Sequence, residues 1–304
     1  SSIELLKINN VFGLTLPLYR IETGSTYFIT SLFDDEKKLG SFIVRLLPFI
    51  ISLLILFEIK FLKKIEIKLI ILILSGILVF LSSERVALFL FVFFFIFSLK
   101  IFEKKIFILL FLIFSLTTVS IFQPRLIDKY IPSTLTQFGI LNTYTIYDEK
   151  DKLIPFWNKM NFSNMNYISE EHQKLIKSGI EIFKENPITG SGIKTYHRYC
   201  KNLKEKKLLD IKCSSHPHNT YVQLLSDIGL FGAIIVFFVF IYILIINLKI
   251  LLIKNPSYIL KSFFVLNIGI LMNLMPLIPS GSFFNNWINI MIYYPIGLWF
   301  YLFS

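Results

Sequence analysis

The sequence lacks the short motifs that mark many soluble enzymes and nucleotide-binding proteins. Its 304 residues contain no Gly-x-Ser-x-Gly nucleophile elbow, no Walker-type phosphate loop and no dinucleotide-binding fingerprint. Charged residues make up only 17% of the chain, and the lysines cluster at the ends of apolar runs rather than in a basic stripe interleaved with aromatic residues. The net charge of +11 therefore does not indicate a nucleic-acid partner.

Cysteine is also scarce. The only two cysteines, Cys200 and Cys213, are not in the Cys-x2–4-Cys form that zinc sites often use, so we expect no metal ion and no other cofactor, although His197, His216 and His218 are near one another. In an oxidising compartment the two cysteines can form a disulfide that holds the histidine-containing segment. The alternative is a pair of unbonded thiols.

Apolar residues, in contrast, are abundant. Hydrophobic residues make up 55% of the chain, 33 of them phenylalanine, and the mean hydropathy is +0.67. A soluble domain of this length is far less apolar, so the composition predicts an all-α polytopic membrane protein. A spanning helix needs about 20 apolar residues. We predict seven spans, at 41–57, 68–83, 86–99, 106–123, 220–247, 262–279 and 285–303.

The second and third spans are short, and Glu84 and Arg85 lie between them. One continuous helix over 69–99 would be about 46 Å long, which exceeds a hydrocarbon core of about 30 Å. Two spans joined by a tight turn fit a bilayer better.

The charges of the short loops predict the topology. Lysines fill the short loops on one side of the spans, whereas the short turns on the other side hold only Arg85. Short loops rich in lysine stay in the cytoplasm. We therefore expect spans over 1–123, a periplasmic loop over 124–218 and three spans over 219–304. Because the chain begins with Ser1 and no signal peptide is apparent, we also expect that upstream spans are missing.

Part of the predicted loop has helical character. Apolar residues recur at helical spacing after Ser169, which is a suitable N-cap, and two glutamates follow it in the first turn. This short amphipathic helix is expected to end near Asn186 and Pro187. In the turn that follows, over 188–192, two glycines permit positive φ or a close approach of backbones.

The clearest candidate for chemistry is His218. The string His-Pro-His-Asn over 216–219 stands directly ahead of an apolar run. Because the positive end of a helix disfavours imidazolium, His218 is expected to stay neutral near pH 7, as a general base must. The alternative for any single histidine is a structural, hydrogen-bonded role.

Polar residues continue from this string into the apolar run. Asn219 is expected to cap the helix, and Gln223 and Asp227 follow at four-residue spacing on the same face. Such a stripe is expected to face a cavity rather than lipid. Gly229 follows Asn219 after nine intervening residues.

Arginine is distributed differently from lysine. Every cation of the inner loops is lysine, whereas all five arginines fall on the outer face or at outer span ends: Arg20, Arg45, Arg85, Arg125 and Arg198. Planar guanidinium groups suit bidentate binding of phosphate, so the pattern indicates a lipid-linked phosphate or pyrophosphate. The alternative is contact with lipid headgroups or acidic loop residues.

The individual arginines differ in strength as candidates. Arg85 is the strongest because it lies between two short apolar spans, although a structural turn is the alternative for it. Arg45 lies about one turn inside its span and is expected to face the bundle interior. Arg125 follows Pro124 just outside the membrane, where a side chain can simply snorkel.

These motifs together resemble a known family. His218-Asn219, nine residues and Gly229 are similar to the periplasmic-loop signature of the O-antigen ligase and polymerase superfamily of membrane glycosyltransferases. Residues 182–192 resemble the family's segment ending in Asn-Pro-(apolar)-x-Gly-x-Gly. Residues 83–87 resemble its Ser-Arg-Gly-Ala element, with Glu84 inserted before the arginine and Val86 in place of glycine. Residues 31–42 resemble a family loop that precedes a span.

The resemblance covers most of 25–245 and implies metal-independent transfer of a glycan from undecaprenyl pyrophosphate to a sugar hydroxyl, at the outer face of the bacterial inner membrane. It implies that His218 activates the acceptor and that arginines bind the pyrophosphate. Many members carry Arg and Trp at the start of the loop helix, where this chain has His172 and Ile176. The role of that arginine is then unfilled or has moved to Arg198.

The acceptor remains open at this point. Motif similarity favours a ligase of lipopolysaccharide biosynthesis, with the lipid A core as acceptor, and the alternative is a polymerase whose acceptor is another carrier-linked glycan. A flippase or other transporter would show paired broken helices and charged groups near mid-membrane, and no such internal repeat is present in the sequence. The expected partners are thus the donor, one of these acceptors and membrane lipid.

Overall fold

In the computed structural model, the chain forms two compact units, Ser1–Asn164 and Met165–Ser304. The division between them falls inside the segment predicted as a long loop. The structure describes the following residues: 4–9, 15–21, 26–27, 38–57, 67–101, 109, 113, 117, 134–136, 138–141, 161, 169–205, 211–276 and 278–303.

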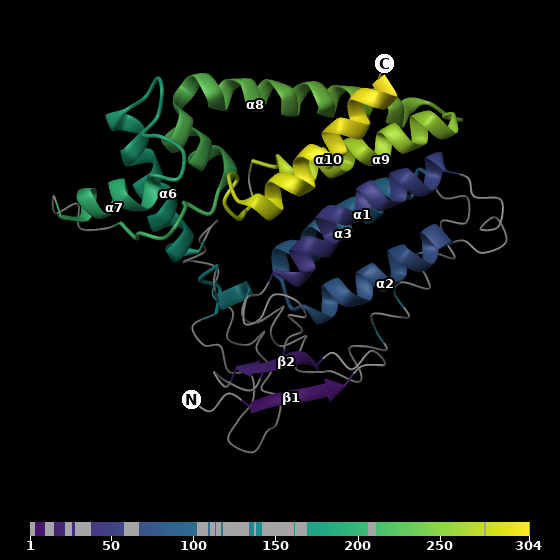
Figure 1. Ribbon diagram of the computed structural model, residues 1–304, viewed down its shortest axis with the longest axis horizontal. Helices are drawn as coiled ribbons and strands as arrows, with labels where there is room; N and C mark the ends of the chain where they lie inside the picture. Colours follow the sequence, from purple (N-terminus) through teal and green to yellow (C-terminus); the bar gives the residue numbers. More distant parts are fainter. Residues whose placement is uncertain are drawn as a thin grey trace. The chain divides into compact units, whose positions relative to one another are not determined.

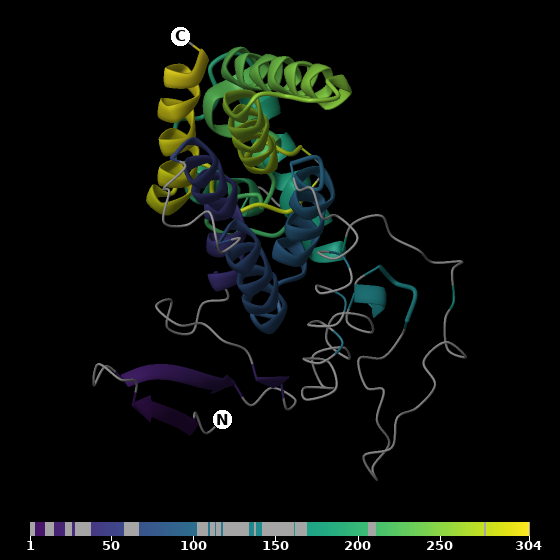
Figure 2. The same cartoon turned by 90° about the vertical axis from the view of Figure 1, so that its right-hand side faces the viewer.

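The first unit begins with a small antiparallel sheet in the order β1-β2-β3. β1 (Glu4–Asn9) pairs with β2 (Thr15–Ile21), so that the two strands run in opposite directions (Figure 2), and β2 pairs with β3 (Thr26–Tyr27). These strands correct the all-α prediction, which holds for the other described elements. A strand of six or seven residues is too short to register in a search for membrane-length apolar runs.

Among the described residues of this unit, three helices have bounds: α1 (Leu39–Leu56), α2 (Ile67–Leu81) and α3 (Arg85–Ser98). Each contacts the other two. α2 and α3 are separate helices joined by a tight turn in which Ser83 has a φ of 58°, at the place where the length argument requires a break. Apolar side chains at helical spacing are buried on α1 and α3, namely Val44, Leu47, Ile51, Leu90, Phe91 and Phe94.

The second unit contains the remaining described helices (Figure 1): α6 (Glu170–Glu185), α7 (Tyr196–Glu205), α8 (Thr220–Leu252), α9 (Tyr258–Asn273) and α10 (Asn286–Phe303). α6 packs against α7 and α8, α8 packs against α9, and α9 packs against α10. Ser169 caps α6 by accepting a hydrogen bond from the His172 amide, and Glu170 and Glu171 occupy the positive first turn.

Two described helices, α1 and α8, are long and apolar enough to cross a membrane, judged by length and composition. α2, α3 and α9 are apolar but shorter. Of the seven predicted spans, the one at 106–123 lies outside the described residues except for single positions. Large apolar side chains on α8 are exposed, as expected of a helix that faces lipid, including Phe231, Phe238 and Leu252.

The predicted span at 262–279 is wrong in its bounds. α9 begins at Tyr258 and ends at Asn273, three residues before Pro276. A proline restricts the residue before it to extended conformations and has no backbone N–H to donate, and Pro279 repeats the constraint. The residues after α9 are therefore free of the helix, and they contact the N-terminal end of α8.

Candidate active site

His218 lies immediately before the N-cap of α8 and is half-buried. Its φ is 54°, in the left-handed region that few residues other than glycine occupy. The Asn219 Oδ1 accepts hydrogen bonds of 3.1 Å from the amides of Tyr221 and Val222, so Asn219 caps the helix. His218 thus lies at the N-terminus of α8, which is the positive end of the helix dipole.

Two other imidazoles lie beside His218. The ring centroid of His216 is 4.1 Å from that of His218, and the His172 ring, on α6, meets it edge-on at 5.7 Å. Burial lowers the pKa of His218 to about 4, with further lowering by His216, His172 and Lys212. His218 is therefore neutral at pH 7. Within the described residues, no three His, Cys, Asp or Glu side chains are grouped to hold a metal ion.

His216 and His218 differ in their hydrogen bonds. The Nε2 of His216 lies 3.3 Å from the carbonyl oxygen of Ser280, and its Nδ1 lies 2.9 Å from Ser215 Oγ. Because a carbonyl only accepts, Nε2 carries a hydrogen, and in the neutral ring Nδ1 accepts from Ser215. No group in the described part of the chain hydrogen-bonds to a ring nitrogen of His218. His216 is held in place, whereas His218 can exchange a proton with a substrate.

The polar stripe on α8 faces protein, so the prediction that it faces a cavity is wrong. Gln223 and Asp227 are buried. Gln223 Nε2 donates to Asp227 Oδ2 and to Ser282 Oγ, and its Oε1 accepts from the Phe283 amide at 2.8 Å. Ser282 and Phe283 come from the segment after α9, between the predicted spans 262–279 and 285–303. Pro276 and Pro279 were the available signal that the predicted span at 262–279 ends early.

The turn after α6 packs against a break in α8, visible as the bend near the start of that helix (Figure 1). Gly229 has a φ of 71° and a ψ of −172°, so the helical hydrogen bonds are interrupted there. The carbonyls of Ser226 and Asp227 instead accept from the amides of Ser191 and Gly192, and the Leu230 amide donates to Pro187. The two glycine-containing motifs of the sequence are therefore two sides of one backbone contact.

Glycine is required on both sides of this contact. A Cβ on Gly229 would lie 2.2 Å from the carbonyl oxygen of Ile188, and a Cβ on Gly190 would lie 2.5 Å from the carbonyl of Asp227. Neither obstacle is a flexible side chain. The contact joins α6, which carries His172, to α8, which follows His218.

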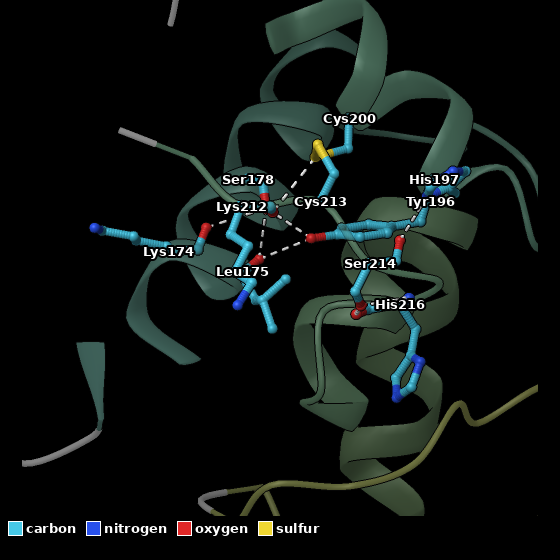
Figure 3. Close-up of a disulfide and its surroundings, with 10 residues drawn as sticks. All are labelled: Lys174, Leu175, Ser178, Tyr196, His197, Cys200, Lys212, Cys213, Ser214 and His216. Carbon is cyan, nitrogen blue, oxygen red and sulfur yellow. Dashed lines mark hydrogen bonds between the residues drawn. A yellow bond between two sulfur atoms is a disulfide. The ribbon is translucent and has the colours of Figure 1, made fainter. Parts of the chain in front are cut away.

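Cys200 on α7 and Cys213 are joined by a disulfide (Figure 3). It adjoins a buried cluster that includes Ile182 and Tyr196. The Tyr196 hydroxyl donates to the Leu175 carbonyl at 3.0 Å and lies 2.6 Å from Ser178 Oγ. Burial raises the pKa of Tyr196 to about 12, so the hydroxyl stays protonated. α6, α7 and the segment leading to His218 are thus tied together.

In the first unit, Glu84 links α3 to α1. Its carboxylate accepts hydrogen bonds from the Gly40 amide at 2.6 Å, the Ser41 amide at 3.1 Å and the Ser41 hydroxyl at 2.6 Å. Burial raises the pKa of Glu84, and these bonds and the charge of Arg45 oppose the rise. Glu84, the insertion in the Ser-Arg-Gly-Ala element, thus caps the N-terminus of α1.

The arginine candidates differ in burial and in the helix that carries them. Arg45 is buried on α1, close enough to Glu84 for their charges to interact. Arg85 is the half-buried first residue of α3. Arg198 is exposed on α7, with its guanidinium 5.5 Å from the ring centroid of Tyr199. Arg125 lies outside the described residues.

Comparison with known protein families gives a match. A family model described as O-antigen ligase matches residues 70–237, which is more than half of the chain. The matched range begins within α2, includes the turn between α2 and α3, and ends in α8 beyond Gly229. No curated protein and no solved structure matches the chain.

Proposed function

The chain belongs to the O-antigen ligase family, and on this basis we propose that it transfers a glycan from undecaprenyl pyrophosphate to a sugar hydroxyl, without a metal, at the outer face of the bacterial inner membrane. Membership supports a ligase or polymerase function in general. The lead proposal is ligation to the lipid A core, and extension of a carrier-linked glycan is the alternative. The disulfide supports an extracytoplasmic position for the segment that carries Cys200 and Cys213, because disulfides persist in oxidising compartments.

The observation that carries this proposal is the state of His218. The imidazole is neutral at pH 7, and within the described residues its ring nitrogens have no hydrogen-bonding partner. In the proposed reaction it accepts the proton of the acceptor hydroxyl while the hydroxyl oxygen bonds to the anomeric carbon. The bond between that carbon and the pyrophosphate oxygen breaks, and undecaprenyl pyrophosphate leaves with the electron pair.

Arg85 and Arg45 are proposed to bind the leaving pyrophosphate. Arg85 begins α3, where the helix dipole favours anions and disfavours a cation. Helix stability therefore gives no reason for an arginine there, whereas a phosphate group would be stabilised by the guanidinium and by the helix end together. Glu84 keeps this turn bonded to the start of α1, four residues before Arg45.

The two other arginine candidates have weaker support. In the second unit His172, and not Arg198, contacts His218. We therefore propose that Arg198 acts at most as a peripheral contact for the donor. Arg125 lies outside the described residues, so its proposed contact with the pyrophosphate rests on the sequence pattern.

The proposal is tested by His218→Ala in the producing bacterium, with separate measurement of core-linked glycan and carrier-linked chain length. A ligase without its base accumulates long carrier-linked polymer, whereas a polymerase without its base accumulates single repeats. His197→Ala is the matched control, because it removes an exposed imidazole on α7. Normal amounts of both products in the His218→Ala strain would refute the catalytic role.

Arg85→Lys tests the pyrophosphate contact separately. Lysine keeps the charge but loses the planar pair of donors that fits two phosphate oxygens. We expect at least a tenfold loss of transfer and weaker binding of undecaprenyl pyrophosphate to the purified protein. Full activity and unchanged binding would show that Arg85 only closes the turn between α2 and α3.

A further inference from the structure

Ser280 directs all of its polar groups at the turn that carries His218. Its amide donates to the His218 carbonyl at 2.9 Å, and its carbonyl accepts from His216 Nε2 at 3.3 Å. Its hydroxyl accepts from Thr220 Oγ1 at 2.8 Å. One residue after α9, distant in sequence, thus contacts the residues on both sides of the imidazole as well as His218 itself.

His218 needs such support because its backbone is strained. A non-glycine residue at a φ of 54° costs on the order of 1 kcal/mol or more, and the conformation persists only where surrounding contacts enforce it. The Asn219 side chain caps the helix by accepting from the Tyr221 amide, which does not involve the His218 backbone. The His216 ring lies against the His218 ring without a hydrogen bond to it. Among the described residues, the bond from the Ser280 amide is the hydrogen bond that acts on the His218 backbone directly.

The residues around Ser280 are themselves anchored to α8. Asn219 Nδ2 donates to the Pro276 carbonyl at 2.7 Å, and Gln223 contacts both Ser282 and Phe283. Ser280 therefore lies between two attachments, and its amide cannot move away from His218 without disturbing one of them. The segment around Ser280 is therefore held rigidly enough to enforce the strained backbone conformation of His218.

We infer that Ser280 is the positioning residue for His218, holding the imidazole in the orientation from which it takes the acceptor proton. The inference rests on the proposed role of His218 as general base. Ser280 does not touch the substrate in this view. It acts through the His218 carbonyl and through the ring of His216, whose Nε2 it engages.

Ser280→Pro tests this directly, because proline lacks the amide that bonds to His218. Ser257→Pro is the matched control: Ser257 also follows a proline, it has a φ of −59° that suits proline, and it caps α9 away from this turn. The substrates are the undecaprenyl-pyrophosphate-linked glycan and the lipid A core purified from the producing cells. Folding is checked by size-exclusion elution and by thermal unfolding in detergent.

We expect Ser280→Pro to lower kcat about a hundredfold, with the KM for the donor changed less than threefold. The acid limb of the pH profile should also move upward toward 6.5, because a released ring leaves its buried surroundings. A loss of stability alone would not move this limb. Ser257→Pro should retain the kcat and the pH profile of the wild type.

His216→Leu and His216→Gln give a second test if Ser280→Pro does not fold. Leucine cannot donate to the Ser280 carbonyl, whereas the glutamine amide can. We expect leucine to lower kcat at least tenfold and glutamine to restore most of it. Equal kcat for the two, or a wild-type kcat and pH profile in folded Ser280→Pro, overturns the inference. If His218→Ala itself retains activity, the proposed function fails instead, whatever the Ser280 variants show.

Discussion

Gly229→Ala would place a methyl group where the backbone of the turn after α6 already lies. The new Cβ would be 2.2 Å from the Ile188 carbonyl oxygen and 2.6 Å from the Gly190 amide nitrogen. The φ and ψ of Gly229 also fall in a region that is almost exclusive to glycine. The variant must therefore either separate the turn from α8 or straighten the helix.

The cost follows from the contacts that are lost. The unfavourable backbone conformation costs about 1–3 kcal/mol. Separating the turn from α8 breaks three backbone hydrogen bonds, each contributing about 1 kcal/mol. A loss of about 5 kcal/mol is comparable to the whole stability of many domains, and it corresponds to a decrease in Tm on the order of 10 °C.

The assay is thermal unfolding of detergent-purified protein, combined with glycan transfer in cells. Gly297→Ala is the matched control, because a Cβ there meets no atom within 4 Å, and alanine favours a helix over glycine by about 1 kcal/mol. We expect a large loss of Tm and of transfer for Gly229→Ala, and neither loss for Gly297→Ala. If both variants unfold at the wild-type temperature, the backbone contact at Gly229 is not what holds these segments together.

Three further predictions concern His218, the disulfide and Glu84. The lowered pKa of His218 keeps the base neutral above about pH 4, so kcat/KM should rise through about pH 4 and stay level through pH 6.5; an acid limb at 6.5 would contradict this. Replacing both Cys200 and Cys213 by serine should destabilise the second unit by about 2–4 kcal/mol, and dithiothreitol should lower the Tm of the wild type but not of the variant. Glu84→Gln turns a side-chain amide toward backbone donors of α1, so we expect a loss of about 1–3 kcal/mol in unfolding free energy, whereas an unchanged Tm would rule out this cap.

Most helices were predictable because apolar runs and helical spacing are properties of the local sequence. The bounds of α1, α2, α3 and α10 agree with the predicted spans to within two residues. α9 was predicted to extend to 279 because apolar residues continue past its end. Hydropathy does not register that a proline ends the hydrogen-bonded ladder.

The functional roles were less predictable because they depend on contacts between distant segments. Glu84 looked like an insertion in a motif, since the amides of Gly40 and Ser41 that it caps lie more than forty residues away. Ser280 had no local signal at all, because its contacts with the 216–220 turn cross about sixty residues of chain.

The sequence by itself determined the apolar, mostly helical class, the turn between α2 and α3, the family resemblance and His218 as the leading candidate base. Those follow from composition, periodicity and short motifs, which are local. Only the tertiary structure decided that Gly190 and Gly229 belong to one backbone contact and that the residues after α9 support His218. Backbone hydrogen bonds and buried polar pairs carry no residue-type signature, so the partner of a given amide becomes known only when the chain has folded.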